Sequence, residues 1–327
     1  MRSLIVHRLS FPIRGSFRIS RGAKTAADVV VVEISEAGAI GRGECVPYGR
    51  YGETMDGVVA AIEARSDALT AGMDRLSLNR EMPAGAARNA IDCALWDLEA
   101  KLSGVPAWQL AGLSWPPQPL ITAFTISVDT PEAMAAAALA AAGRPLLKLK
   151  LAGFGDIERV RAVRAAVPEA RLIADANESW SVERLRAFAP EMAALRVEMI
   201  EQPLPADEDN ELAGLDLPLP LVADESCHGR DGLDRLKGRY QLVNIKLDKT
   251  GGLTEALRLK AAAKAAGFGV MVGCMVSSSL AMAPAMLVAQ GVQLVDLDGP
   301  LLLLADRQHG LRYDGARIHP PQPELWG

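Results

Sequence analysis

The sequence has few cysteines, no long hydrophobic run and no excess of positive charge. Its four cysteines lie far apart and form no Cys-x-x-Cys pair, so neither a disulfide framework nor a structural zinc site is indicated. The longest nearly unbroken apolar run, residues 133–142, is about half the length that a membrane-spanning helix needs, and we expect no such helix. The net charge is −5 and the basic residues are scattered, which argues against a nucleic-acid surface.

A secretory leader is not expected either. The short apolar segment Leu4–Val6 is followed by His7 and Arg8, which interrupt it before it reaches the length of a signal-peptide core. We therefore expect a cytoplasmic protein with reduced thiols. Half of the residues are hydrophobic and 23% are charged, so the chain can bury a large core. These features predict a soluble globular protein whose partner is a small molecule, and they leave a homo-oligomer open.

The N-terminal third predicts an α+β domain. Strand-forming segments occupy much of residues 1–45, and helical periodicity follows over residues 54–69 and 85–102. The proline-rich stretch 115–119 is typical of a linker, because proline is stiff and cannot donate a hydrogen bond to a sheet. We therefore place the end of the first domain at residue 115.

Eight short apolar segments alternate with helical stretches beyond the linker. The polar residues that end these segments recur every 22–28 residues, which is about the length of one βα unit. Repeated right-handed βα units close into a barrel. Little sequence follows the eighth segment, so we expect an α/β fold, a modified TIM barrel of (β/α)7β type over residues 116–299, with residues 300–327 folding back on the first domain. A doubly wound open sheet is the competing topology. The expected strands are 121–127, 146–151, 171–176, 197–201, 219–223, 242–247, 269–273 and 293–297.

Three consecutive predicted strands end in a carboxylate, at Asp175, Glu201 and Asp224. Neighbouring strands lie about 4.8 Å apart, so these carboxylates crowd together and need a cation. Hard oxygen donors without a nearby histidine or thiolate favour Mg²⁺, with coordination positions left for water and substrate. The alternative is that Asp175 and Asp224 cap the helices that follow, but an acid in three consecutive units favours the metal site.

Lysines occupy the strands on either side of this acidic arc. Lys148 and Lys150 alternate with leucines and share one face of the second strand, which points inward in a closed barrel. We expect their repulsion to lower the pKa of one of them toward the range of a base. Lys246 ends the sixth strand, four strands away, so Lys150 and Lys246 face each other across the barrel mouth. One can remove an α-proton while the other returns a proton to the opposite face, which inverts the configuration. Solvated lysines on an edge strand are the alternative.

Two further features suggest where the charged ends of a substrate bind. Asp296 and Asp298 share one face at the eighth strand, and we expect this pair to be free to bind a substrate cation such as an α-ammonium group. A simple turn before Gly299 is the alternative. Arg21 lies in a glycine-containing loop, where it either clamps a distal carboxylate or is solvated.

These motifs resemble the dipeptide epimerases of the enolase superfamily, muconate lactonizing subgroup. The resemblance extends over nearly the whole chain and implies a (β/α)7β barrel with an α+β capping domain and one Mg²⁺ per subunit. It also implies epimerisation of L-Ala-D-Glu and L-Ala-L-Glu in peptidoglycan peptide recycling. The motifs that carry it are Lys148-x-Lys150, Asp175-Ala176-Asn177, Glu201-Gln202-Pro203, Asp224-Glu225-Ser226, Asn244-Ile245-Lys246 and Asp296-x-Asp298.

The resemblance also implies roles for individual residues. Lys150 would handle the proton on the R-face and Lys246 that on the S-face, while Lys148 helps to neutralise the bound carboxylate. The pair at the eighth strand would hold the dipeptide ammonium, and Arg21 would bind the glutamate side chain. The other residues that it places against the substrate are Thr125, Cys274 and Met275.

The metal and lysine motifs leave alternatives within the subgroup. Cycloisomerases, o-succinylbenzoate synthases and N-acylamino acid racemases share them, and only the strand-eight pair is specific to dipeptides. Residues 276–279 lack the acidic residue that many dipeptide epimerases carry there, so the dipeptide preference stays open. An inactive barrel that serves as a binding module is an alternative of another class.

Overall fold

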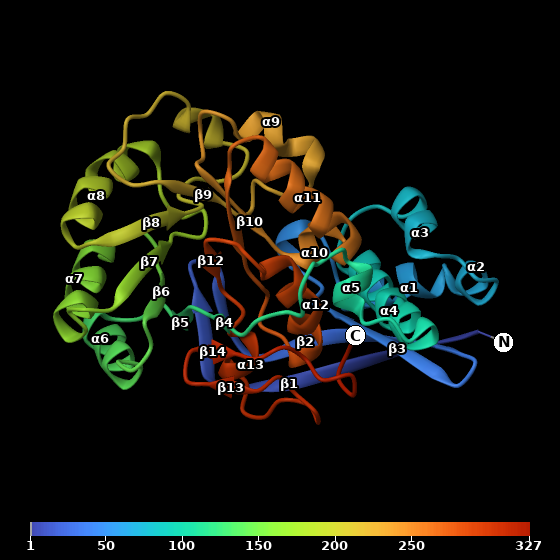
Figure 1. Ribbon diagram of the computed structural model, residues 1–327. Helices are drawn as coiled ribbons and strands as arrows, with labels where there is room; N and C mark the ends of the chain where they lie inside the picture. The colour runs from blue at the N-terminus through green and yellow to red at the C-terminus, as the bar shows by residue number, and fades with distance from the viewer. Residues whose placement is uncertain (1) are drawn as a thin grey trace.

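A three-stranded antiparallel sheet begins the chain in the computed structural model, which describes residues 2–327. Strands β1 (Ser3–Ile19) and β2 (Gly22–Glu36) form a long hairpin, and β3 (Ala39–Cys45) pairs with β2. The valine-rich segment of β2 is buried because it packs against the helices that follow. The tip of the hairpin extends to the mouth of the barrel (Figure 1), where the Ser20 hydroxyl donates to the Asn177 carbonyl.

Helices cover one face of this sheet. The central one, α4, packs so closely on β3 that a side chain at Gly41 or Gly43 would collide with the carbonyl oxygens of α4. The predicted helix over 54–69 is wrong in one respect, since it is two helices; the Arg65 N–H turns back to the Ile62 carbonyl and ends the first. The helical elements are η1 (Gly49–Tyr51), α1 (Met55–Glu63), α2 (Ser66–Thr70), α3 (Arg75–Glu81), α4 (Ala86–Ser103) and α5 (Ala107–Leu110).

The second domain is a parallel barrel, and all eight of its predicted strands are present in sequential order. The Ala123 N–H donates to the Val295 carbonyl at 2.8 Å, which joins the first strand to the last. The modified TIM barrel with an α+β capping domain is therefore confirmed, and the open doubly wound sheet is not formed. The strands are β5 (Phe124–Ile126), β6 (Leu146–Lys150), β7 (Arg171–Asp175), β8 (Val197–Glu201), β9 (Leu221–Ala223), β10 (Leu242–Ile245), β11 (Gly269–Val272) and β12 (Leu294–Val295).

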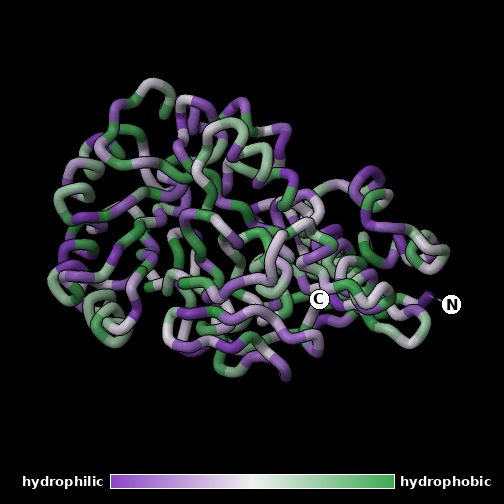
Figure 2. The backbone as a smooth tube through the Cα atoms, viewed as in Figure 1, coloured by the Kyte–Doolittle hydropathy of each residue, from purple (hydrophilic) through white to green (hydrophobic). Residues whose placement is uncertain are grey.

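Helices surround most of the barrel (Figure 1), and many of them carry both hydrophilic and hydrophobic residues (Figure 2). The connection between β8 and β9 is the exception in the described chain, since it holds only one short 3-10 turn. None of the helices within residues 2–327 is both long and apolar enough to cross a membrane. The elements are α6 (Pro131–Ala140), α7 (Asp156–Ala166), α8 (Val182–Ala194), η2 (Asp209–Leu212), η3 (Arg230–Gly232), α9 (Leu233–Leu236), α10 (Leu247–Thr250), α11 (Leu253–Ala265), α12 (Ser279–Ala289) and α13 (Gly299–Leu302).

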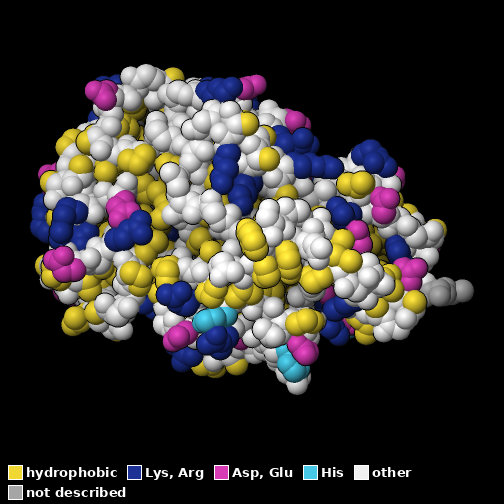
Figure 3. Space-filling view, in the orientation of Figure 1, with side chains coloured by type: hydrophobic (Ala, Val, Ile, Leu, Met, Phe, Trp, Pro, Cys, Tyr) yellow, Lys and Arg dark blue, Asp and Glu magenta, His cyan; other side chains and the backbone are white. Residues whose placement is uncertain are grey.

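The residues after β12 return to the first domain. Leu303 forms a bridge to Ile13 of β1, and the Arg307 guanidinium pairs with buried Glu44 of β3 at 2.8 Å. Trp326 is fully buried, and its indole N–H donates to the Cys93 carbonyl of α4. A small sheet forms from β4 (Leu120–Ile121), β13 (Tyr313–Asp314) and β14 (Arg317–Ile318). On the surface, lysine and arginine side chains are interspersed with acidic ones over the face drawn in Figure 3.

Candidate active site

A cavity of about 330 Å³ lies where the hairpin tip and η1 cover the carboxyl ends of the barrel strands. This is the end at which TIM-barrel enzymes place their catalytic groups. Its lining combines apolar and charged side chains, as expected for a site that orients a small polar molecule. The sequence-predicted residues that line it are Arg21, Thr125, Lys150, Asp224, Lys246, Cys274, Met275, Asp296 and Asp298.

The three predicted metal-binding carboxylates converge at this end of the barrel. Asp175 and Glu201 end β7 and β8 and are directly paired in register, and Asp224 follows β9 by one residue. One oxygen from each lies within 4.8 Å of the others, and all three side chains are buried. Buried carboxylates this close repel one another unless cations lie between them, so the group has the chemistry of a site for a hard divalent cation.

Lysine ammonium groups contact these three carboxylates. The Lys150 Nζ lies 2.6 Å from Asp175 and the Lys246 Nζ lies 2.6 Å from Asp224, so the two lysines contact opposite ends of the row of carboxylates. Lys148 is in the middle, with its Nζ 2.7 Å from the Glu201 carboxylate. The predicted opposition of the two lysines is consistent with these contacts, because β6 and β10 flank the three strands that carry the acids.

The expected lowering of a lysine pKa does not occur at Lys148. Burial opposes the charge on Lys148, but attraction by Asp296, Glu201 and Asp175 outweighs it and raises the pKa well above its usual value. Burial also opposes the charge on Lys246, and Asp224 raises its pKa in the same way. Repulsion between the lysines is outweighed here because each ammonium group lies within 3 Å of a carboxylate.

The acids of the trio differ in their proton affinity. Burial favours neutral Asp175, yet Lys150 and Lys148 outweigh it and hold its pKa at about 2. Burial and the charge of Asp175 raise the pKa of Glu201 to about 7. The pKa of Asp224 is well below its usual value despite burial, because Lys246 and Lys249 both attract its charge. The two outer carboxylates are thus ionised at neutral pH, and the middle one is the most easily protonated.

Two supporting side chains were not predicted as parts of the site. The Asn244 amide donates to the Glu201 Oε1 at 2.8 Å, which fixes the orientation of that carboxylate. Lys249 is buried beneath the site and donates to the Asp224 Oδ1 and to the carbonyl oxygens of Asp224 and Asn244. The sequence signal for Lys249 is its place three residues after Lys246.

Asp296 and Asp298, the two acids after β12, make different contacts. Asp296 accepts a hydrogen bond from the Lys148 Nζ at 2.8 Å, so the prediction that both carboxylates are free is wrong. Asp298 accepts from the Thr125 N–H at 2.6 Å and lines the cavity. The pair does not act as one unit, because Lys148 reaches across from β6 to the first acid only. Burial and the charge of Asp296 raise the pKa of Asp298 to about 7.

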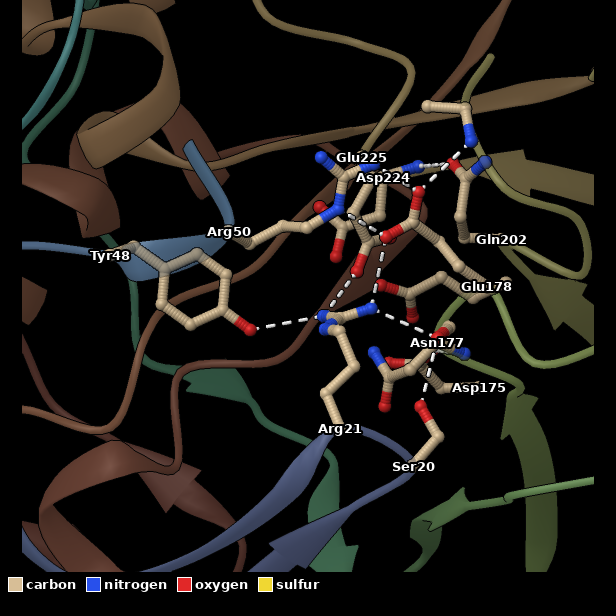
Figure 4. A network of polar contacts seen from close by, with 12 residues as sticks. Ser20, Arg21, Tyr48, Arg50, Asp175, Asn177, Glu178, Gln202, Asp224 and Glu225 are labelled. Atoms are coloured by element: carbon tan, nitrogen blue, oxygen red, sulfur yellow. Dashed lines mark hydrogen bonds and ion pairs between the residues drawn. The ribbon is translucent and has the colours of Figure 1, made fainter. Parts of the chain in front are cut away.

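Arg21 is partly exposed to solvent, and its guanidinium group already has partners. Its guanidinium lies 2.7 Å from Glu225 and 3.1 Å from Glu178, and it also donates to the Tyr48 hydroxyl and the Asn177 carbonyl (Figure 4). Lys24 from the same hairpin also lines the cavity and lies over the Tyr48 ring. Neither glutamate is predicted from the sequence as part of the site, because Glu225 stands within the motif assigned to metal binding through Asp224 and Glu178 lies just beyond the motif that begins at Asp175.

Apolar side chains also line the cavity. Cys274 and Met275 line it together with Phe17 and Val276. Burial and the charge of Asp296 raise the pKa of the Cys274 thiol, so this side chain contributes shape and not a reactive thiolate.

The chain is similar to known families over both of its domains. Residues 1–112 match the family described as mandelate racemase / muconate lactonizing enzyme, N-terminal domain, and residues 132–321 match the family described as enolase C-terminal domain-like. The chain belongs to the enolase superfamily. The resemblance drawn from its motifs is thereby confirmed, and the fold and the converging carboxylates agree with it.

Individual members of the superfamily are similar along the whole chain. The L-Ala-D/L-Glu epimerase of Escherichia coli is 48% identical over 98% of this chain and 100% of its own length. The N-acetyl-D-glutamate racemase of a Pseudoalteromonas species is also 48% identical, over 91% of this chain and 95% of its own.

Solved structures of other proteins are also similar over nearly the whole chain. An enolase family member from Agrobacterium tumefaciens, with bound sodium, L-Ala-L-Glu and an ordered loop, is 54% identical and covers 100% of both chains with a TM-score of 0.99. The dipeptide epimerase of Cytophaga hutchinsonii, in complex with Mg and D-Ala-L-Val, is 29% identical over 98% of this chain and 93% of its own, with a TM-score of 0.91.

Proposed function

We propose that this protein is a Mg²⁺-dependent dipeptide epimerase that inverts the C-terminal residue of its substrate, with L-Ala-D-Glu and L-Ala-L-Glu as its natural pair. The observation that carries the proposal is the placement of Lys150 and Lys246 at opposite ends of the buried carboxylates. The relatives support the same reaction, since the Escherichia coli protein at 48% identity is an L-Ala-D/L-Glu epimerase.

The residues present fit one Mg²⁺ ion per subunit. Asp175, Glu201 and Asp224 would hold it through one oxygen each, with the remaining positions open to water and substrate. Such an ion, when bound, supplies a divalent charge that stabilises the negative charge developing on the substrate carboxylate as the α-proton leaves. Lys150 and Lys246, which contact the outer carboxylates here, would be freer to face the substrate if those carboxylates held the ion.

The lysines are proposed to move the proton. One neutral amine removes the α-proton from its own side of the substrate, and the other, as an ammonium, returns a proton from the opposite side. We assign the R-face to Lys150 and the S-face to Lys246. Lys148 keeps its charge between Glu201 and Asp296, and it would help to neutralise the substrate carboxylate.

The charged walls of the cavity suit the two ends of such a dipeptide. Asp298 is proposed to accept the α-ammonium group, because Asp296 is already paired with Lys148. At the other end, the side-chain carboxylate of glutamate would meet Arg21, with Lys24 beside it. The apolar wall at Cys274 and Met275, together with Thr125, would then enclose the small N-terminal residue.

A cytoplasmic location and a role in recycling the peptides of peptidoglycan belong to the same proposal. They rest on the substrate, because L-Ala-D-Glu is a fragment of that polymer. The domain bounds at residues 115 and 300 are proposed with them, supported by the absence of secondary structure over residues 114–119 and by the contacts of the final segment with β1 and β3.

Exchange in D₂O tests the reaction. The enzyme with Mg²⁺ should incorporate deuterium at the C-terminal α-carbon starting from either L-Ala-D-Glu or L-Ala-L-Glu, and the two should interconvert. A cycloisomerase, an o-succinylbenzoate synthase or an inactive binding module would leave both dipeptides unexchanged, and that result would remove the proposal.

Racemisation of N-acylated glutamate is the second candidate, and the N-acetyl-D-glutamate racemase at 48% identity favours it. The two candidates differ at the amino end of the substrate, since an N-acyl group carries no charge and cannot pair with Asp298. A ratio of kcat/KM for L-Ala-L-Glu over N-acetyl-L-glutamate well above one supports the dipeptide, and a ratio below one supports the alternative.

A further inference from the structure

Two separate segments of the capping domain meet the barrel rim at one side chain, Glu178. Arg21 comes from the tip of the β1–β2 hairpin, and Arg50 comes from η1 after β3. Both guanidinium groups reach the carboxylate of Glu178, which lies just beyond β7 (Figure 4). The cavity is covered by these same two segments, so this contact joins the barrel to both parts of its cover.

The Glu178 carboxylate is fully coordinated. Its Oε2 accepts from the Arg50 Nε at 2.7 Å and from the Arg21 Nη1 at 3.1 Å. Its Oε1 accepts from the Arg50 Nη2 at 2.7 Å and from the Ala206 N–H at 2.9 Å, in the loop after β8. The side chain is only 7% exposed, so these charge-assisted bonds are shielded from solvent more than those of an ordinary surface pair.

The backbone is held in an unusual conformation to present this side chain. Asn177 and Glu178 both have positive φ, at 45° and 65°, in the left-handed region that non-glycine residues rarely adopt. The turn is fixed from both sides, since the Glu178 N–H donates to the Gln202 carbonyl and the Asn177 N–H donates to the Asp175 carboxylate. Strain of this kind persists where surrounding contacts impose it, and it often marks a functional position.

We infer that Glu178 is a positioning residue. Through Arg21 and Arg50, it holds both covering segments in place on the end of β7, the strand that carries Asp175. It does not touch the reacting atoms. Its role is to make the closed arrangement of the two segments cooperative, so that loss of either arginine contact loosens the other segment. The inference rests on the proposed function for its kinetic readout alone, because closure and metal binding are measured without turnover.

The first test compares Glu178→Gln with the matched control Glu255→Gln. Glu255 makes a similar bidentate pair with Arg230, 13% exposed, outside the cavity. For Glu178→Gln we expect trypsin to cut after Arg21 and Arg50 about fivefold faster or more, and KM for L-Ala-L-Glu to rise about tenfold with kcat within about threefold of wild type. The Mn²⁺ dissociation constant should stay within about twofold, and the control should match wild type throughout.

The second test asks whether the two segments are coupled. Arg50→Gln removes two of the four donors to Glu178 and leaves Arg21 intact. We expect trypsin cleavage after Arg21 to accelerate in this variant, although residue 50 does not contact residue 21 through any bond of its own. This variant also decides the matter if Glu178→Gln fails to fold, which circular dichroism would reveal.

Three results would overturn the inference. Cleavage after Arg21 that is unchanged in Arg50→Gln shows that the segments close independently. Glu178→Gln that behaves like Glu255→Gln shows that the contact has no positioning role. A Mn²⁺ dissociation constant that rises in step with KM shows that Glu178 acts through the Asp175 turn and not through the covering segments. A protein with no epimerase activity at all would still give the proteolysis and Mn²⁺ readouts, so failure of the proposed function is distinguishable.

Discussion

The individual carboxylates of this site differ in role because they contact different partners. Asp296 and Asp298 are two residues apart and both line the cavity, yet Lys148 donates to the first, while the second accepts from the Thr125 N–H. Sequence spacing places both acids on one face but cannot predict this division, because Lys148 comes from a strand about 150 residues earlier. The acid trio was predictable, since its geometry follows from adjacent strand ends and needs no knowledge of side-chain rotamers.

Asp298→Asn tests the ammonium contact. We expect kcat/KM for L-Ala-L-Glu to fall about tenfold or more, because a charge-assisted bond to the substrate becomes a neutral one. An N-acetylated substrate carries no such charge and should lose less than about threefold. Parallel steady-state kinetics on the two substrates measure the difference, and an equal loss on both would remove the ammonium role from Asp298.

The pH dependence follows from the same residue. The pKa of Asp298 is raised to about 7 by burial and by Asp296, so its carboxylate gains a proton as the pH falls through neutrality. The substrate ammonium, with a pKa of about 8, stays protonated over this range. We therefore expect kcat/KM for the dipeptide to decrease below about pH 7. In Asp298→Asn this decrease at low pH should be absent from the pH profile. A decrease that persists unchanged in the variant would show that another group titrates there.

Strands position the site, and their order could be predicted because each βα unit repeats at nearly constant length. The element boundaries were less predictable. The first predicted strand, 121–127, divides into β4 and β5, since residues 120–121 pair with β14 near the C-terminus and leave the barrel. That pairing joins residues almost 200 positions apart, so a local sequence pattern cannot predict it. The same applies to Asn244 of β10, whose role depends on Glu201 at the end of β8, two strands away in the sheet.

Asn244→Ala tests how β10 supports β8. Loss of the amide that orients Glu201 should raise the dissociation constant for Mg²⁺ by about 10- to 100-fold, because residues that hold metal ligands in place have effects of this size. Isothermal titration with Mg²⁺ measures it. Asn79→Ala is the control, since Asn79 makes a similar bond to buried Asp92 far from the cavity. Equal affinities in Asn244→Ala and the control would mean that Glu201 is held without Asn244.

The last residues of the chain hold the two domains together. Trp326 is 1% exposed and donates to the Cys93 carbonyl of α4, whereas Trp115 in the linker is 78% exposed. The sequence predicted that the tail folds back on the first domain, because too little chain remained after the eighth strand for an outer helix. It did not predict which side chain would anchor the tail.

Trp326→Ala should lower the free energy of unfolding by about 3–5 kcal/mol, the usual effect of removing a buried indole. Trp115→Ala should change it by less than about 0.5 kcal/mol, since an exposed side chain makes few contacts. Urea denaturation measures both. If the two variants lose equal stability, the tail does not hold the domains as its burial indicates.

Two amines acting from opposite sides of one carbon are the centre of this account, and α-proton exchange in single-lysine variants tests them most directly. With Mg²⁺ in D₂O, Lys246→Ala should exchange the α-proton of L-Ala-D-Glu but not that of L-Ala-L-Glu, and Lys150→Ala should do the reverse, with no epimerisation in either. If both variants exchange the same isomer, or if either one still interconverts the two, the lysines do not serve opposite faces and the account is contradicted.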